Sequence, residues 1–280
     1  MRKVVDSNYL QKPELRQYLS ASKQNTAVLT DYASMEAYKG DTLASIYKAM
    51  SVLAEFPQQV VILKNTLFVC GLSGRGSGLQ QRFIDTSQTK RFSVYCNNLI
   101  AARSGNMALQ RQLLELGREA TRHLEERMLA DAKSMPTAIE YVATTYTKEE
   151  LAALRTTTRY SDQTVKKLIE SVLYIALNLF QKHPSVRNLP RQKEMPNTFI
   201  FRAALCTYLL ALEWISVAGA HGAKAARATT IRNDMVDVNF AAYATFFDGL
   251  LSSDAKVQRI YLEARVLLAT VFGCHIVGGP

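Results

Sequence analysis

Three short apolar runs, separated by helical patterns, occupy the first 67 residues of the chain. The runs are residues 3–5 (KVV), 26–30 (TAVLT) and 60–63 (VVIL), and their β-branched side chains favour strands. Pro13 opens the helical stretch after the first run, since proline suits the first turn of a helix. A second helix is expected at residues 32–39, and a third ends near Glu55. This order of elements predicts a parallel sheet covered by helices, which is an α/β fold.

The middle of the chain has a different pattern, in which long helical stretches follow a glycine-rich loop at residues 71–78 (GLSGRGSG). The loop has the Gly-x4-Gly spacing of a phosphate loop, but Ser77 stands where that motif needs lysine, which argues against nucleotide hydrolysis. The expected helices are 107–134, 148–158, 162–181 and 197–220. In the third of them, helical spacing predicts a buried stripe of Leu168, Val172, Ile175, Ala176 and Leu179.

Residues 82–95 combine cations with aromatic side chains, among them Arg91, Phe92 and Tyr95. Such a mixture is typical of surfaces that hold phosphate groups and stack on bases. An ordinary amphipathic hairpin would have the same composition, so both interpretations stay open at this point.

The α/β pattern returns from residue 231. Asp237 is expected to begin a helix, residues 249–252 (GLLS) to form a short strand, and Asp254 to begin the last helix. We therefore expect residues 1–67 and 225–280 to form one α/β core, with residues 68–224 as a mainly helical insertion.

The net charge of the chain is +10 and is unevenly distributed. Residues 68–224 hold 21 Lys and Arg against 13 Asp and Glu, a balance of +8, which leaves the two ends at +2. A basic insertion attracts polyanions through phosphate contacts, which favours a nucleic-acid partner. A well-solvated basic surface accounts for the same charge.

The cysteines and the apolar segments indicate the compartment. The four cysteines have neither zinc-site nor disulfide-framework spacing, and the first residues lack a signal-peptide pattern, so we expect a reduced, cytoplasmic protein. The most apolar stretch, 199–220, is interrupted by Arg202 and Glu213. This pattern favours a buried core helix over a membrane span, and no membrane partner is expected.

Four carboxylates stand out by their place in this pattern: Asp6, Glu36, Asp237 and Asp254. Asp6 and Asp254 each follow a predicted strand, and ligands of parallel sheets gather at the carboxyl ends of the strands. We therefore expect these two residues to meet in space. Acids in these positions also have an ordinary interpretation: Asp31, Asp41, Asp237 and Asp254 stand where helix caps are expected, and Glu36 could face solvent.

The two ends of the chain resemble the PIN-domain family of nucleases. The matching pieces are residues 3–8 (KVVDSN), the helix containing Ser34-Met35-Glu36, and residues 237–254 (DVNFAAYATFFDGLLSSD), which are similar to the family's late acidic helix, short strand and final Ser-x-Asp. The resemblance implies a catalytic, metal-binding set of Asp6, Glu36, Asp237 and Asp254, with Asp234 as a fifth candidate ligand. It implies substrate-binding roles for Asn8, Ser252 and Arg232.

Carboxylate oxygens are the ligands that Mg²⁺ and Mn²⁺ favour, and ions held in this way activate a water for attack on a phosphodiester bond. The resemblance thus implies an endonuclease that depends on Mg²⁺ or Mn²⁺, cleaves RNA rather than DNA, and acts as a toxin or defence effector. The insertion could shape a substrate channel, bind a protein regulator or form an oligomer contact. Two alternatives remain: a non-catalytic nucleic-acid-binding or scaffold protein on the same fold, and a structure-specific DNA 5′-nuclease.

Overall fold

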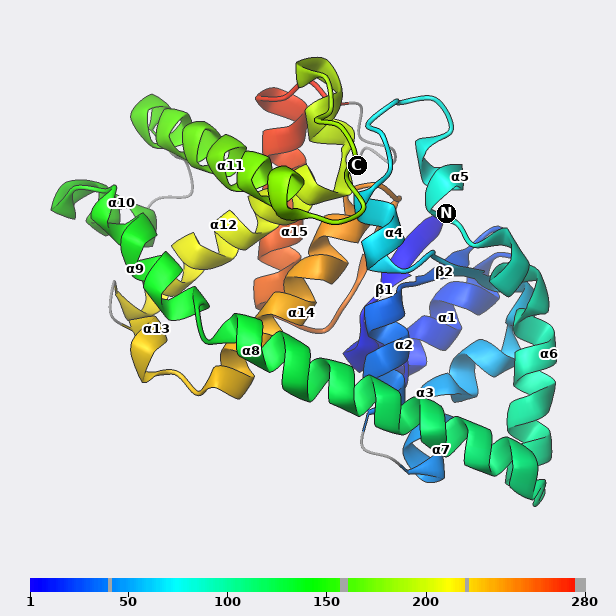
Figure 1. The fold of residues 1–280 in the computed structure, drawn as a ribbon. Coiled ribbons are helices and arrows are strands. Elements are labelled where there is room, and N and C mark those ends of the chain that lie inside the picture. The colour runs from blue at the N-terminus through cyan, green and yellow to red at the C-terminus, as the bar shows by residue number, and fades with distance from the viewer. Residues whose placement is uncertain (40–41, 157–160, 220–221, 275–280) are drawn as a thin grey trace.

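Figure 1 shows the computed structural model of the chain, which describes residues 1–39, 42–156, 161–219 and 222–274. Within these ranges four strands form one sheet in the order β3-β2-β1-β4, and every neighbouring pair is parallel. The strands are β1 Arg2–Val5, β2 Thr26–Leu29, β3 Val60–Ile62 and β4 Gly249–Leu251. The expected α/β class, a parallel sheet flanked by helices and interrupted by a mainly helical stretch, is confirmed.

The sheet joins the two ends of the chain. Val4 of β1 pairs with Val28 of β2 on one side and with Leu250 of β4 on the other, and all three side chains are buried. The helices of this part are η1 Ser7–Tyr9, α1 Pro13–Ala21, α2 Asp31–Tyr38, α3 Leu43–Glu55, η2 Pro57–Gln59, α14 Ala228–Ala244 and α15 Ala255–Thr270. Helix α14 packs on β1, β4 and α15, so the last part of the chain is built directly onto the first.

The stretch between β3 and α14 is helical throughout its described residues, apart from loops and one isolated bridge between Leu63 and Ile84. Helices α7 and α8 are joined by a π-helical turn, η3 His123–Arg127, and cross the front of the molecule in Figure 1, where α7 contacts α2 and α8 contacts α14. The other helices are α4 Thr66–Cys70, α5 Leu79–Phe83, α6 Thr86–Arg103, α7 Met107–Arg122, α8 Met128–Ala132, α9 Met135–Thr144, α10 Lys148–Thr156, α11 Asp162–Lys182, η4 Gln192–Asn197, α12 Phe199–Ala218 and α13 Gly222–Ala225.

Helix α12 is the centre of the helical part. By length and composition alone, Phe199–Val217 is apolar enough to cross a membrane, but 67% of that window is buried inside the protein. The helix packs against α9, α11, α14 and α15, which accounts for apolar residues on all of its sides. The expectation of a core helix agrees with this position.

Two predicted helix starts are wrong. Thr30, not Asp31, caps α2, because its hydroxyl accepts the Ala33 N–H at 3.1 Å while its backbone is extended. Asp237 does not begin a helix either, since α14 starts at Ala228 and nothing in its sequence interrupts the helix before Asp237. By contrast, Asp254 does cap α15 as expected. The expected cap at Asp41 lies outside the described residues.

Two further details differ from the predicted pattern. Residues 82–95 are not a hairpin: α5 ends within them and α6 begins at Thr86, capped by Asp85. On α11 the buried stripe continues to Phe180, whereas Leu179 is exposed, because Phe180 lies four residues after Ala176 and so continues its side of the helix.

Candidate functional site

The carboxyl edge of the sheet contains a point where the strand order reverses. From β1 the chain proceeds through β2 to β3 in one direction, while β4 pairs with the opposite side of β1. Open α/β sheets bind ligands at such a reversal, outside the carboxyl ends of the two strands that flank it. Here those ends carry Asp6 after β1 and the segment 252–254 after β4.

Asp6 is almost fully buried, with 1% of its surface exposed. The Ser252 hydroxyl donates to Asp6 Oδ2 at 2.5 Å, while the Ser7 hydroxyl and the Asn8 N–H donate to Oδ1 at 3.3 and 3.4 Å. Burial raises the pKa of Asp6, and these hydrogen bonds oppose the rise. The nearby charge of Asp254 raises the pKa further, so the two acids interact electrostatically, as expected from their strand ends.

Asp254 combines a helix cap with a place in this cluster. Its Oδ1 accepts the N–H groups of Lys256 and Val257 at 2.7 and 3.1 Å, and its own N–H donates to Ser252 Oγ at 3.0 Å. Ser252 therefore links Asp254 to Asp6. Asp254 Oδ2 has no hydrogen bond with any described residue, which leaves one oxygen free for a ligand.

Asn8 ties together the loops that follow β1 and β4. Its Oδ1 accepts from the N–H and hydroxyl of Ser253 at 3.3 and 3.0 Å, and Asn8 itself is exposed. The predicted substrate-binding pair Asn8 and Ser252 thus borders the acidic residues from two loops.

Asp237 faces the same group of acids from α14. Burial raises its pKa, and the charges of Asp6, Asp254 and Asp234 raise it further, to about 8, while Lys256 lowers it. Asp237 forms no hydrogen bond or ion pair with a described residue. A carboxyl group without a partner beside other carboxylates is the kind of group that a cation stabilises.

Asp234, the fifth candidate, has protein partners. It accepts a hydrogen bond from Trp214 Nε1 at 2.8 Å and forms an ion pair with Lys256 Nζ. Sequence patterns did not indicate either partner, because Trp214 belongs to α12 and Lys256 to α15, and neither helix adjoins Asp234 in the sequence. Asp234 and Lys256 therefore balance each other at the border of the cluster.

Glu36 and Arg232 are not linked to this group by any described interaction. Glu36 lies 3.7 Å from Lys39 Nζ, and its charge is not among those that shift the pKa of Asp6 or Asp237. Its helix α2 does contact η1, the turn directly after Asp6. Arg232 is buried, and its guanidinium donates to Asn233 Oδ1 at 2.7 and 3.2 Å.

The donor set is chemically suited to a hard divalent cation but is not gathered around one point. Asp6, Asp237, Asp254 and Ser252 offer only oxygen atoms, which Mg²⁺ and Mn²⁺ prefer. Among the described residues, however, no three Asp, Glu, His or Cys side chains lie close enough to hold one ion together. Mg²⁺ commonly binds through one or two carboxylates and retains waters, so this arrangement suits partly water-mediated binding.

Comparison with known proteins adds no identification. No protein-family model matches the sequence, and no curated protein or solved structure is significantly similar to the chain. The case for a function therefore rests on the residues and their geometry.

Proposed function

We propose that this protein is a metal-dependent endonuclease of PIN-like fold that hydrolyses phosphodiester bonds in RNA. The observation that carries the proposal is the electrostatic coupling of Asp6, Asp237 and Asp254 at the reversal of strand order. Neighbouring acidic groups whose charges raise the pKa of a buried carboxyl are characteristic of functional sites, because a folded protein gains nothing from them structurally. The PIN-like assignment and the preference for RNA rest on the resemblance of residues 3–8 and 237–254.

The chain's own residues would divide the work in this site. Asp6, Asp237 and Asp254 would hold Mg²⁺ or Mn²⁺ directly or through waters. Bound there, the ion would supply an activated water and stabilise negative charge on the leaving oxygen. Ser252 would orient Asp6 through its hydrogen bond, and Asn8 would hold the two loops at their observed separation.

Cleavage assays with labelled substrates test the proposal. Wild-type protein and the variants Asp6→Asn and Asp254→Asn are incubated with single-stranded RNA, single-stranded DNA and a DNA flap, with Mg²⁺, with Mn²⁺ and with a chelator. We expect RNA cleavage by the wild type alone, abolished by the chelator. Cleavage of the flap but not of RNA would instead favour a DNA 5′-nuclease. Sequencing RNA ends from cells that express the wild type or Asp6→Asn then identifies the targets, and growth curves of the same cells measure any growth inhibition.

A non-catalytic nucleic-acid-binding protein is the second candidate. The absence of a three-ligand cluster among the described side chains favours it. It predicts RNA binding that survives Asp6→Asn and no cleavage with either metal. Calorimetric titration of the wild type and Asp6→Asn with Mn²⁺ distinguishes the two candidates, because only the nuclease requires a metal site that depends on Asp6.

A further inference from the structure

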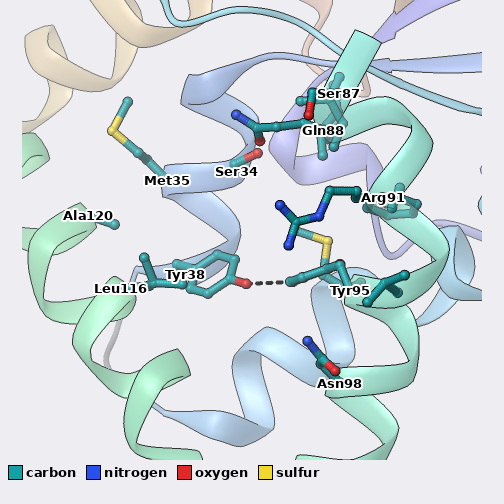
Figure 2. Close-up of a pocket in the computed structure, with 15 residues that line it drawn as sticks. Ser34, Met35, Tyr38, Ser87, Gln88, Arg91, Tyr95, Asn98, Leu116 and Ala120 are labelled. Carbon is teal, nitrogen blue, oxygen red and sulfur yellow. Dashed lines mark hydrogen bonds between the residues drawn. The ribbon is translucent and has the colours of Figure 1, made fainter. Parts of the chain in front are cut away.

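A cavity of about 470 Å³ lies on the same edge of the sheet as the acidic residues, but at the ends of β2 and β3. Its walls come from α2, α6 and α7, and its floor includes Leu29 and Ile62, the last residues of their strands. Figure 2 shows the space between α2 and α6, with Leu116 and Ala120 of α7 on the far side of α2 from α6. Its volume is within the range of small-ligand sites.

The lining combines an apolar body with a polar rim. Leu29, Met50 and Phe92 are buried, whereas Ser87, Gln88 and Asn98 are exposed at the rim. Tyr38 and Tyr95 join their hydroxyl groups across the space at 2.6 Å, which holds α2 and α6 at a fixed separation (Figure 2). In the α6 wall, Phe92 lies beside Tyr95, with 5.5 Å between the ring centroids.

Arg91 is the charged residue of the lining. Figure 2 shows its side chain reaching from α6 into the space beside the two tyrosines, with Ser34 and Gln88 at one end. Arg91 has no hydrogen bond or ion pair with a described residue, and none of the described residues that line the cavity is acidic. An unpaired guanidinium above an apolar floor fits a ligand that has both a flat ring and a negative charge.

The cavity is close to the acidic residues. Neighbouring strands lie about 4.8 Å apart, so the ends of β2 and β3 are about 5–10 Å along the edge from the end of β1. One nucleotide advances about 3.4 Å along a strand of a stacked duplex, and a single strand that is not stacked advances further per nucleotide. A nucleic acid whose phosphate lies at Asp6 would thus bring a base one to three nucleotides away to this cavity.

We propose that this cavity binds an unpaired base of a single-stranded nucleic acid, next to the position at which the strand is cleaved; this rests on the proposed nuclease function. The ring of the base lies on the apolar floor beside Phe92 and Tyr95, and Arg91 contacts its phosphate. Asn98 offers both a donor and an acceptor to the edge of the base, and Gln88, whose Nε2 also donates to Asp85 Oδ2 at 3.2 Å, offers its amide oxygen and second N–H. A base paired in a duplex cannot enter, so the cavity selects single strands. An apolar side chain of a protein partner would use the floor but would leave Arg91 without a partner.

Two pairs of variants on α6 test this proposal. Arg91→Gln removes the unpaired charge, and Arg103→Gln removes an equal charge from an exposed position of the same helix outside the cavity. Val94→Asp places an acid in the lining, and Ile100→Asp places one outside it; the two positions are 50% and 62% exposed, so both variants should fold. Binding of fluorescein-labelled single-stranded RNA is measured by anisotropy in chelator, which prevents metal-dependent cleavage, with a duplex of the same sequence as comparison.

We expect Arg91→Gln and Val94→Asp to weaken single-strand binding about ten-fold or more, the range for the loss of one stacked base, and the two controls to stay within about two-fold of the wild type. The duplex should bind more weakly than the single strand. The proposal is overturned if each variant and its control lose the same affinity for single-stranded RNA, or if the wild type binds the duplex more tightly than the single strand. The proposal is also overturned if all four variants bind RNA as the wild type does while Arg91→Gln abolishes the binding of a protein partner.

The same variants separate this inference from the nuclease function. Binding that depends on Arg91, without metal-dependent cleavage by the wild type, supports the base site and refutes the nuclease. Cleavage that depends on Asp6 but is unaffected by Arg91→Gln and Val94→Asp supports the nuclease and refutes the base site.

Discussion

Two halves of one sheet edge use acidic residues in different ways. Asp6 follows β1 and Asp31 follows β2, so the sequence pattern is the same: a short strand and then an acid. Burial raises the pKa of both. Asp31, however, accepts hydrogen bonds from the N–H and the hydroxyl of Thr66 at 2.7 and 2.8 Å and so anchors α4 to the end of β2. Asp6 also accepts hydrogen bonds, the shortest from the Ser252 hydroxyl, but it lies beside two further acids, Asp254 and Asp237.

This difference teaches that an acid at a strand end becomes a candidate ligand only where the fold brings other acids to it. On the β1 and β4 side, three carboxylates share one region and Asp237 has no described partner. On the β2 and β3 side, Thr66 satisfies Asp31, and the cavity lined by Arg91 and Tyr38 has an apolar floor at the ends of the two strands. Charge and apolar surface thus lie next to each other, as the phosphate and the base of a nucleotide do.

The largest expected effect separates Asp6 from Asp31. Asp6→Asn should lower cleavage on the order of a thousand-fold, about 4 kcal/mol of transition-state stabilisation, while the protein stays folded, because asparagine preserves size and removes a ligand charge. Asp254→Asn should act similarly, since asparagine also caps helices. The measurement is the metal-dependent cleavage rate alongside the melting temperature of the same preparations.

Asp31→Asn should show the opposite pattern. Its amide NH₂ would face a donor of Thr66, so one buried hydrogen bond is lost and the free energy of unfolding falls by roughly 1–3 kcal/mol. The cleavage rate per folded molecule should stay near that of the wild type. If Asp6→Asn and Asp31→Asn had the same cleavage rate and the same stability, the two halves of the sheet edge would not differ in function.

Ser252→Ala should have the next largest effect. The Ser252 hydroxyl donates to Asp6 and accepts from the backbone N–H of Asp254, so its loss frees the Asp6 carboxylate to reorient and removes the link between the two residues. Groups that orient metal ligands typically contribute 10–100-fold to affinity or activity, and we expect a drop in cleavage of that size. The apparent Mg²⁺ requirement should shift to higher concentration. Ser253→Ala, which removes only the hydroxyl contact with Asn8, is the matched control and should lower cleavage less.

Asp237 should make the stability of the metal-free protein depend on pH. Its pKa in the folded protein, about 8, lies above the ordinary value of 3.8. The contribution of protonated Asp237 to the free energy of unfolding is therefore complete below pH 4 and is lost as the pH rises through 8. In chelator at pH 8, Asp237→Asn should raise the free energy of unfolding by roughly 1–3 kcal/mol, less than the full linkage of about 1.4 kcal/mol per pKa unit because the side chain retains solvent contact.

Thermal unfolding of the wild type and Asp237→Asn at pH 5 and pH 8 measures this dependence. The difference between the two proteins should be larger at pH 8 and should shrink when Mg²⁺ is added. A constant difference across pH would show that Asp237 is not held among other charges.

The smallest expected effect belongs to the apolar half. Tyr38→Phe removes the hydroxyl pair with Tyr95 but retains the ring, so the free energy of unfolding should fall by about 1 kcal/mol. Tyr174→Phe on the exposed side of α11 is the control and should change stability little, since Tyr174 is 66% exposed. Chemical denaturation of the wild type, Tyr38→Phe and Tyr174→Phe measures the free energies of unfolding. Equal values for the two variants would mean that the hydroxyl pair contributes nothing to stability.

Much of the sheet edge could be predicted from local pattern. The β-branched runs identify the strands, and parallel strands place Asp6 and Asp254 at one edge, because carboxyl ends of parallel strands coincide. The cap at Asp254 follows from residue type and position, since a short polar side chain satisfies the first N–H groups of the following helix. These features depend on interactions within a few residues or on the general geometry of parallel sheets.

Other features depend on partners that are distant in the sequence. Whether Asp31 caps a helix or anchors Thr66 is decided by where α4 packs, and the ion pair of Asp234 with Lys256 requires α14 and α15 to lie side by side. The cavity needs α2, α6 and α7 together, and the composition of residues 82–95, which supply its aromatic wall, is equally compatible with a hairpin. Local pattern therefore determined the strands and which acids follow them, while only tertiary packing decided which of those acids have partners, because burial and charge coupling arise between segments that the sequence keeps apart.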